Sequence, residues 1–253
     1  MIGKLIYSIY STKNNVEACQ QVIRDKEWDA ISENIKHNTT FLDVGCGAGY
    51  AMFKAQNERN CKVEGIDPNP GAHGVGRYLK ELVNSPRIYQ GFAESLPFES
   101  KKFDLVYSSH VLEHVEDEFK ALQEMKRVMK DDGVLIIGMP TATMAWLNLF
   151  STVLFTTHVR LYEFLRGIFL KGSLARFKLI FRIFSHSYPR ATSIWYDIKH
   201  YRVKNWQRTV EQEFKIEKVI LPCLYPYPDY PQFFKLRKSA RFSSSVFFIC
   251  TKK

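Results

Sequence analysis

The sequence predicts an α/β fold, a doubly wound and mostly parallel sheet of seven strands with an α-helical, basic insertion. Three observations lead to this class. Short apolar segments alternate with amphipathic segments at the spacing of strands and helices. The first apolar segment ends in closely spaced glycines. The alternation stops after Pro140 and resumes near residue 205, so a segment is expected to interrupt the sheet.

Each predicted element follows from its local pattern. Strands are expected where short apolar runs meet turn residues, at residues 39–45, 61–67, 87–93, 103–109, 133–139, 215–225 and 244–253. Helices are expected where apolar residues recur every three or four positions, at residues 14–36, 50–59, 73–83, 116–130 and 205–214. Two glycines weaken the helix at 73–83. The order resembles a Rossmann-like sheet with helices on both faces.

Length and composition limit the class of protein. The chain has 253 residues, which suit one α/β domain with an insertion, and we divide it into 1–140, 141–204 and 205–253. Five scattered cysteines without a C-x-x-C pair argue for a reducing compartment and against a disulfide framework or a metal site. The first residues lack a cleavable secretory pattern, so we expect a cytoplasmic protein.

Charge is distributed unevenly along the chain. Residues 1–159 hold 17 Lys and Arg against 20 Asp and Glu, whereas residues 160–253 hold 19 against 6. The second part therefore carries a net charge of +13 within a total of +10. Such asymmetry indicates contact with something anionic.

The turn after the first strand carries the most specific signal. Its glycines follow the pattern G-x-G-x-G, and Asp43 stands two residues before the first of them. Asp67 ends the second strand 22 residues past Gly45, where a carboxylate reaches the two hydroxyls of a ribose. Tyr50 replaces the third glycine of the dinucleotide fingerprint, which weakens a pyrophosphate-binding interpretation.

Four blocks in order, "LDVGCGAGY", "VEGIDPNP", "GFAESLPFESKKFDLVYSSHVLEHV" and "MKRVMKDDGVLIIGMP", resemble the class I S-adenosylmethionine-dependent methyltransferases, in particular the small-molecule group with an L-D-V-G-C-G-x-G signature. The resemblance covers about residues 39–140 and implies S-adenosyl-L-methionine as cofactor. It implies these cofactor contacts: Asp43, Gly45, Cys46, Gly47 and Gly49 at the methionine part, Asp67 at the ribose, Ala93 and Glu94 at the adenine, and Ser109 beside the methyl group.

The chemistry implied by this resemblance needs little from the protein. A sulfonium cation passes its methyl group in line to a nucleophile, so alignment in a dry site supplies much of the rate. No metal and no covalent nucleophile is expected, and Cys46 is a small filler of the loop. His110 is the candidate catalytic residue, as a general base for a hydroxyl acceptor, with a plain wall residue as the alternative. His114 is expected to be structural.

The region after Pro140 matches no general substrate motif, so the acceptor is open. Four aromatic or histidine residues there are candidates for substrate contact or for a core of the insertion: His186, Tyr196, His200 and Trp206. Residues 144–157 are apolar but too short to span a membrane. Residues 166–186 have the pattern of a basic amphipathic helix, which packs either on the sheet or on lipid.

The lipid interpretation favours a small-molecule or lipid-linked acceptor, with the protein peripheral at an anionic membrane on the cytoplasmic side. Nucleic acid is disfavoured as a partner, because the stretch after the fourth strand reads "YSSH" and lacks a base-amine methylation motif. Pro222-Cys223 stands in the wrong place for a cytosine-5 nucleophile. An RNA-binding methyltransferase, a nicotinamide-dependent oxidoreductase and a non-catalytic adaptor remain as alternatives.

Overall fold

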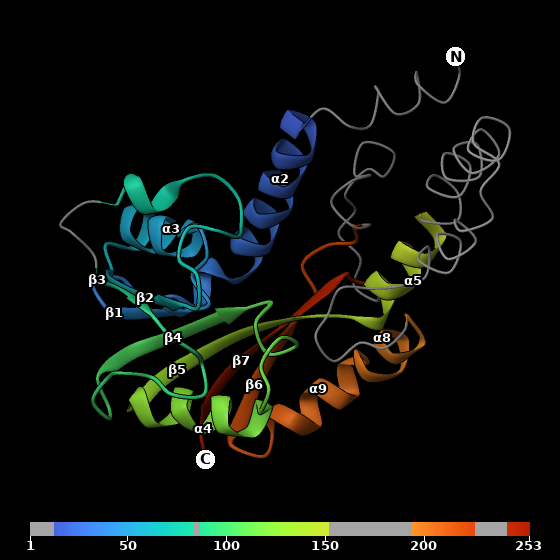
Figure 1. Cartoon of the computed structure of the whole chain (residues 1–253). Helices are drawn as coiled ribbons and strands as arrows, with labels where there is room; N and C mark the ends of the chain where they lie inside the picture. Colours follow the sequence, from blue (N-terminus) through green and yellow to red (C-terminus); the bar gives the residue numbers. More distant parts are fainter. Residues whose placement is uncertain (1–12, 83–86, 152–193, 226–241) are drawn as a thin grey trace, which may run out of the picture.

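The computed structural model describes residues 13–82, 87–151, 194–225 and 242–253. A sheet of seven strands crosses the molecule in the order β3-β2-β1-β4-β5-β7-β6 (Figure 1). All neighbours are parallel except β7, which runs antiparallel to both β5 and β6. The strands are β1 (Thr40–Val44), β2 (Lys62–Asp67), β3 (Arg87–Gln90), β4 (Phe103–Ser109), β5 (Met129–Pro140), β6 (Phe214–Ile220) and β7 (Ser245–Lys252). The predicted fold class is confirmed.

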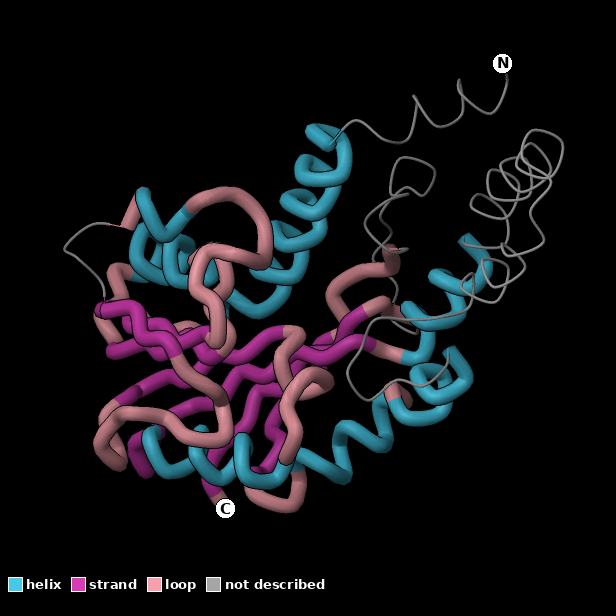
Figure 2. Tube along the Cα trace, viewed as in Figure 1, coloured by secondary structure: helices cyan, strands magenta, loops and turns pink. Residues whose placement is uncertain are grey.

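Helices cover both faces of this sheet. The α-helices are α2 (Lys13–Ile31), α3 (Tyr50–Arg59), α4 (Glu118–Val128), α5 (Ala142–Ser151), α8 (Ile194–His200) and α9 (Val203–Val210), and two 3₁₀ turns are η1 (Ser32–Asn34) and η2 (Tyr78–Lys80). Helices α2 and α3 lie on one face, and α4 and α9 on the other (Figures 1 and 2). Because strand side chains alternate between faces, each face of the sheet has its own core.

Helix α4 shows how the sequence builds one of these cores. Asp117 caps its start, where the side-chain carboxylate accepts a hydrogen bond from the Lys120 backbone N–H at 3.0 Å. Its buried stripe packs against β1, β4 and β5 and consists of Ala121, Leu122, Met125 and Val128. The helix ends at Val128 because β5 already begins at Met129.

One predicted helix is wrong. Residues 73–82 form bends, a turn and the short η2, where a weakened helix was expected at 73–83. Gly74 and Gly76 have φ angles of +102° and +71°, in the left-handed region that a right-handed helix excludes. A Cβ on Gly74 would lie 3.2 Å from the Ala48 backbone nitrogen, so this segment is shaped by its close approach to the glycine turn after β1.

Helix α5 at the start of the predicted insertion and helix α8 near its end pack on each other. Ala145 of α5 and Ile198 of α8 form a small apolar cluster, and Trp206 Nε1 of α9 donates a hydrogen bond to the Pro140 carbonyl at 2.9 Å. The segment boundaries proposed at 140 and 204 stay predictions. The basic amphipathic stretch 166–186 lies outside the described residues, as does His186. Within the described ranges, no helix is long and apolar enough to cross a membrane.

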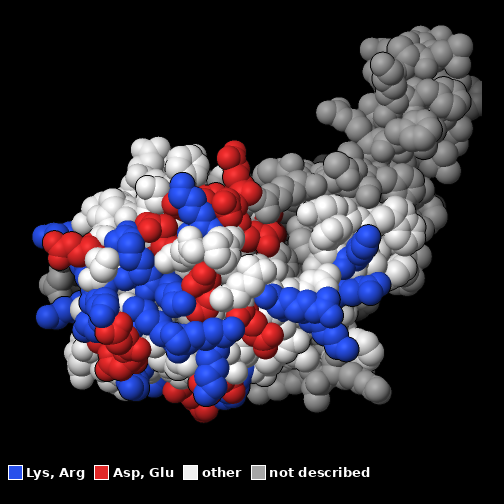
Figure 3. Space-filling view, turned by 90° about the horizontal axis from the view of Figure 1, so that it is seen from below, with Lys and Arg blue, Asp and Glu red and all other residues white. Residues whose placement is uncertain are grey.

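Most of the positive charge in the second part of the chain belongs to residues outside the described ranges. Eleven of its 19 Lys and Arg residues and two of its six acidic residues fall in 160–193 and 226–241. On the face that carries α4, basic and acidic side chains alternate (Figure 3), as in the pairs Lys126–Glu213 at 2.8 Å and Lys101–Asp131 at 2.7 Å. These pairs balance the charge around them, whereas on the right of Figure 3 several Lys and Arg side chains stand together with few acidic neighbours.

Leu122→Ala tests the core beneath α4. The side chain is fully buried, so its removal leaves a cavity, and the free energy of unfolding is expected to fall by about 2–5 kcal/mol. Phe119→Ala on the same helix is the matched control, because that ring is 44% exposed and its loss should cost within about 0.5 kcal/mol. Urea unfolding followed by circular dichroism measures both. Equal losses would contradict this assignment of the buried face.

Candidate active site

The turn between β1 and α3 forms a backbone cradle. The N–H groups of Gly45 and Cys46 both donate to the Ile66 carbonyl, at 2.7 and 3.1 Å, which fixes the turn to the end of β2. Gly45, Gly47 and Gly49 all have positive φ angles, of +79°, +48° and +87°. A Cβ on Gly47 would lie 2.6 Å from the His73 carbonyl oxygen, so only glycine fits there.

Two buried carboxylates stand beside this cradle. Asp67, at the end of β2, accepts hydrogen bonds from the Gly47 and Asn69 backbone N–H groups, at 2.9 and 2.7 Å on different oxygens. Asp43, on β1, is 3% exposed, and its side chain has no hydrogen-bond partner among the described residues. Burial, and then the negative charge of Asp67, raises the pKa of Asp43 to about 8.

No Lys, Arg or His side chain of the described ranges forms an ion pair with either carboxylate. Each Asp67 oxygen receives one N–H and keeps a second lone pair for a further donor. Two buried acids without a counter-ion favour a ligand that brings positive charge and hydroxyl or amine donors. The cradle and the acids therefore suit the cationic, ribose-bearing ligand that the sequence predicts.

The loops after β3 and β4 complete this side of the site. Ala93 is buried, and Glu94 Oε1 accepts a hydrogen bond from the Glu116 backbone N–H at 2.8 Å, joining the two loops. Cys46 is buried in the cradle, and burial raises the pKa of its thiol, so it is a neutral filler at physiological pH. The roles predicted for Ala93, Glu94 and Cys46 toward a ligand stay predictions.

His110 follows Ser109, the last residue of β4, and has an unusual backbone. Its φ angle is +57°, in the left-handed region that residues with side chains seldom adopt, while its N–H donates to the Gly138 carbonyl at 2.9 Å. The imidazole lies between two acids, with Nε2 at 3.6 Å from Glu27 Oε1 and Nδ1 at 3.4 Å from Glu113 Oε1. Such strain at a strand end is typical of functional residues.

Glu27 is the centre of a buried polar network. It is 2% exposed and accepts hydrogen bonds from the Tyr225 hydroxyl at 2.8 Å and the Ser245 hydroxyl at 2.5 Å. Arg24 Nη1 lies 2.6 Å from its other oxygen. Burial opposes ionisation, but Arg24 and His110 outweigh it and hold the pKa of Glu27 well below its usual value.

The charge state of His110 follows from this network. Burial and the Arg24 charge disfavour the imidazolium, yet Glu113 and Glu27 outweigh them, and the pKa of His110 is raised. An imidazolium has no lone pair to offer, so His110 must lose its proton before it can accept one. His110 can therefore act as a general base only after its own imidazole has lost a proton, and this role stays a prediction.

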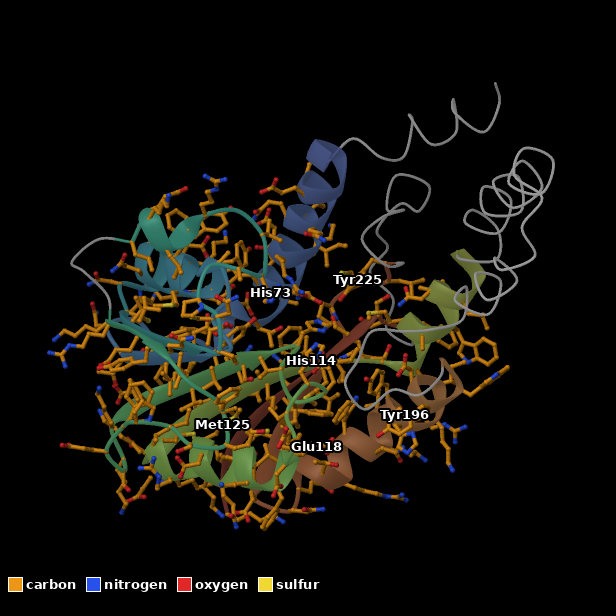
Figure 4. The ribbon with its side chains drawn as sticks, in the orientation of Figure 1. His73, His114, Glu118, Met125, Tyr196 and Tyr225 are labelled. Atoms are coloured by element: carbon orange, nitrogen blue, oxygen red, sulfur yellow. The ribbon has the colours of Figure 1, made fainter. Side chains whose placement is uncertain are left out.

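A cavity of about 190 Å³ opens beside this network. It is lined by Glu113, Glu118, Tyr196, His200, Tyr201, Asn205, Trp206 and Thr209. Three residues singled out as candidates for substrate contact, Tyr196, His200 and Trp206, are therefore brought together. His114 is exposed and does not line it. Figure 4 shows Glu118 at the start of α4 and Tyr196 on α8, on one side of the sheet.

Sequence reasoning missed Glu27, Glu113 and Tyr225. Glu113 had a signal, because it follows His110 by three residues in "HVLEHV". Glu27 had none, since an acid in an amphipathic helix normally faces water, and its partners stand 198 and 218 residues away. In the described part of the chain, no group of three His, Cys, Asp or Glu side chains is placed to hold a metal ion.

Comparison with known proteins identifies the domain. Residues 42–137 match a family model described as "Methyltransferase domain". Two curated relatives are each 30% identical: a tRNA U34 carboxymethyltransferase of Nautilia profundicola over 113 residues, and the ubiquinone/menaquinone biosynthesis C-methyltransferase UbiE of Campylobacter jejuni over 128 residues. These matches cover 44% and 48% of this chain, and 38% and 49% of the relatives, so the chain spans half or less of their length.

Among solved structures, an S-adenosylmethionine-dependent methyltransferase from Thermotoga maritima is similar with a TM-score of 0.55. The superposition covers 93% of this chain and 92% of the other, at 16% sequence identity. At this identity the likeness shows the fold.

Asp43→Asn is expected to stabilise the ligand-free protein at pH 8 and to change little at pH 4. In the unfolded chain Asp43 ionises near pH 4, whereas in the fold its pKa is about 8. The fold therefore retains a proton that the unfolded chain has lost, and the stability of the wild type falls as the pH rises between these values. The expected gain for the Asn variant at pH 8 is up to about 5 kcal/mol, since each unit of pKa difference contributes about 1.4 kcal/mol.

Urea unfolding of both proteins at pH 4, 6 and 8 measures this difference. Asp132→Asn is the matched control, because that acid is exposed at the far end of β5 and should show no such trend. A difference between wild type and Asp43→Asn that stays constant with pH would contradict the buried, protonated carboxyl.

Proposed function

Because this chain carries a class I S-adenosylmethionine-dependent methyltransferase domain, we propose that it transfers the cofactor's methyl group to an oxygen nucleophile on a small, amphipathic or lipid-linked acceptor. The observation that carries the proposal is the pair of buried acids, Asp43 and Asp67, beside the glycine cradle. The substrate and the acceptor atom belong to this proposal, since the two relatives are named for different acceptors.

The residues present fit this cofactor. S-adenosylmethionine brings a sulfonium, an ammonium and two ribose hydroxyls, and when bound it supplies the methyl group. The second lone pairs of the Asp67 oxygens are available to the hydroxyls, and Asp43 is a buried acid that can give up its proton beside the cationic part. Gly45, Gly47 and Gly49 leave room for close approach of the backbone.

The chain's own residues have two tasks in this reaction. The first is to align the reactants and keep water out, which the buried ends of β1 and β4 do. The second is to take the proton that a hydroxyl acceptor releases as it is methylated. His110 is proposed for this task in its neutral form, with Glu27 and Glu113 orienting its ring nitrogens.

The amphipathic character of the acceptor is supported by two observations. The second part of the chain carries a net charge of +13 and a basic amphipathic sequence pattern at residues 166–186. One relative is named for the biosynthesis of ubiquinone and menaquinone. We propose a cytoplasmic location with peripheral contact to an anionic membrane. The tRNA-modifying relative makes RNA the rival acceptor.

Asp67→Asn tests the cofactor proposal. The variant keeps one acceptor oxygen for the backbone but loses the charge and the second acceptor, so affinity for S-adenosylhomocysteine is expected to fall at least about tenfold. Isothermal titration calorimetry measures the affinity, with Asp132→Asn as a control that should bind like the wild type. Absence of binding by the wild type, or protection of its fold by NADH in place of S-adenosylhomocysteine, would contradict the proposal.

Liposome flotation tests the membrane proposal. The full chain is expected to float with vesicles containing 30% phosphatidylserine and to stay behind with pure phosphatidylcholine, because anionic headgroups attract each nearby Lys or Arg. Recovery in the anionic sample should fall steeply when salt is raised from about 0.1 to 0.5 M. Equal recovery with both lipids, or with neither, would count against membrane contact.

A further inference from the structure

We propose that the cavity between the loop after β4 and helices α4, α8 and α9 is the acceptor's binding subsite, and that it takes an organic ammonium group. That the ligand is the methyl acceptor rests on the proposed methyl transfer. That the ligand carries an ammonium group rests on the residues that line the cavity.

Negative charge and aromatic rings make up most of the cavity wall. Glu113 and Glu118 line it, and the described residues of its wall include neither Lys nor Arg. Four rings face it, from Tyr196, His200, Tyr201 and Trp206. Tyr196 and His200 stack at 3.7 Å between ring centroids, and Tyr201 and Trp206 at 5.6 Å. A wall of carboxylates and ring faces attracts a cation and repels an anion.

Glu113 is the wall residue that points most directly to a bound ligand. It is 3% exposed, and neither of its oxygens has a hydrogen-bond partner in the described ranges. His110 Nδ1 lies 3.4 Å from Glu113 Oε1 without the alignment of a hydrogen bond, and this imidazole is shared with Glu27. A buried carboxylate without donors is costly, and an ammonium N–H would satisfy it.

A second buried acid adds negative charge behind the cavity. Asp197 on α8 follows the wall residue Tyr196 and is 2% exposed, and its Oδ1 also lacks a hydrogen-bond partner within the described part. Burial raises the pKa of Asp197 to about 6, so it is largely ionised at neutral pH. The wall residue His200, four positions on in the same helix, acts in the opposite direction and lowers the pKa of Asp197.

The size and place of the cavity indicate what part of an acceptor it holds. Its volume of about 190 Å³ is below the range of about 300–1,000 Å³ for drug-sized ligands, so it suits a head group and not a whole amphipathic molecule. Glu113 joins it to His110 at the end of β4, where the resemblance places the methyl group. An ammonium held at Glu113 thus anchors the acceptor beside the reacting atoms.

Benzylamine, benzyl alcohol and benzoate are the probes, because they share one ring and differ in charge. By protein-observed NMR or calorimetry at pH 7.5, the wild type is expected to bind benzylamine at least fivefold more tightly than benzyl alcohol and to show no binding of benzoate. Glu113→Gln should lower benzylamine affinity at least fivefold. Glu116→Gln, an exposed acid of the same loop, is the matched control and should leave it unchanged.

Thr209→Lys provides a second test of the cavity's charge if Glu113→Gln fails to fold. Thr209 is a half-buried wall residue on α9, and a lysine there should abolish benzylamine binding and admit benzoate. Equal affinity for amine and alcohol, or the same losses in Glu116→Gln, would overturn the inference. If S-adenosylhomocysteine binds and benzylamine does not, this inference alone fails; if only benzylamine binds, with the stated dependence on Glu113, the proposed methyl transfer fails.

Discussion

Glu27 is the buried charge that holds together the segments around the end of β4. It comes from α2, yet its oxygens face the Tyr225 hydroxyl, the Ser245 hydroxyl at the start of β7, and His110. A buried carboxylate is tolerated only with such a set of donors, because each unpaired lone pair in the interior is costly. The position of α2 over the sheet and the position of His110 therefore depend on the same side chain.

The candidate site divides into two electrostatic environments that lie at the ends of neighbouring strands. Beside β1 and β2, Asp43 and Asp67 form an acidic environment without a protein counter-ion in the described ranges. Beside β4, Arg24 and His110 face Glu27, and His110 also faces Glu113. A cationic ligand is favoured at the first environment, and at the second the buried oxygens of Glu113 still lack hydrogen-bond donors among the described residues.

Local patterns predicted most of the sheet, and contacts between distant segments account for what they missed. The strand at 103–109 and the helix at 50–59 match their predictions residue for residue, because period and turn residues act over short distances. The helix expected at 73–83 failed because the fit of Gly74 against Ala48 decides that segment. The glycine turn and Asp67 were found by spacing, but Glu27 was not, since only the fold brings it to Tyr225.

The loop from His110 to Asp117 is the wall that both halves of the site share. Val111 fills the space above Gly45, where a Cβ would lie 2.2 Å from its Cγ2 atom, so the loop touches the cradle directly. Two residues on, Glu113 turns to the opposite side and lines the cavity, and the Glu116 N–H is fixed by Glu94. Because its backbone is tied at the His110 and Glu116 N–H groups, this loop holds Val111 against the cradle and Glu113 at the cavity in one fixed segment.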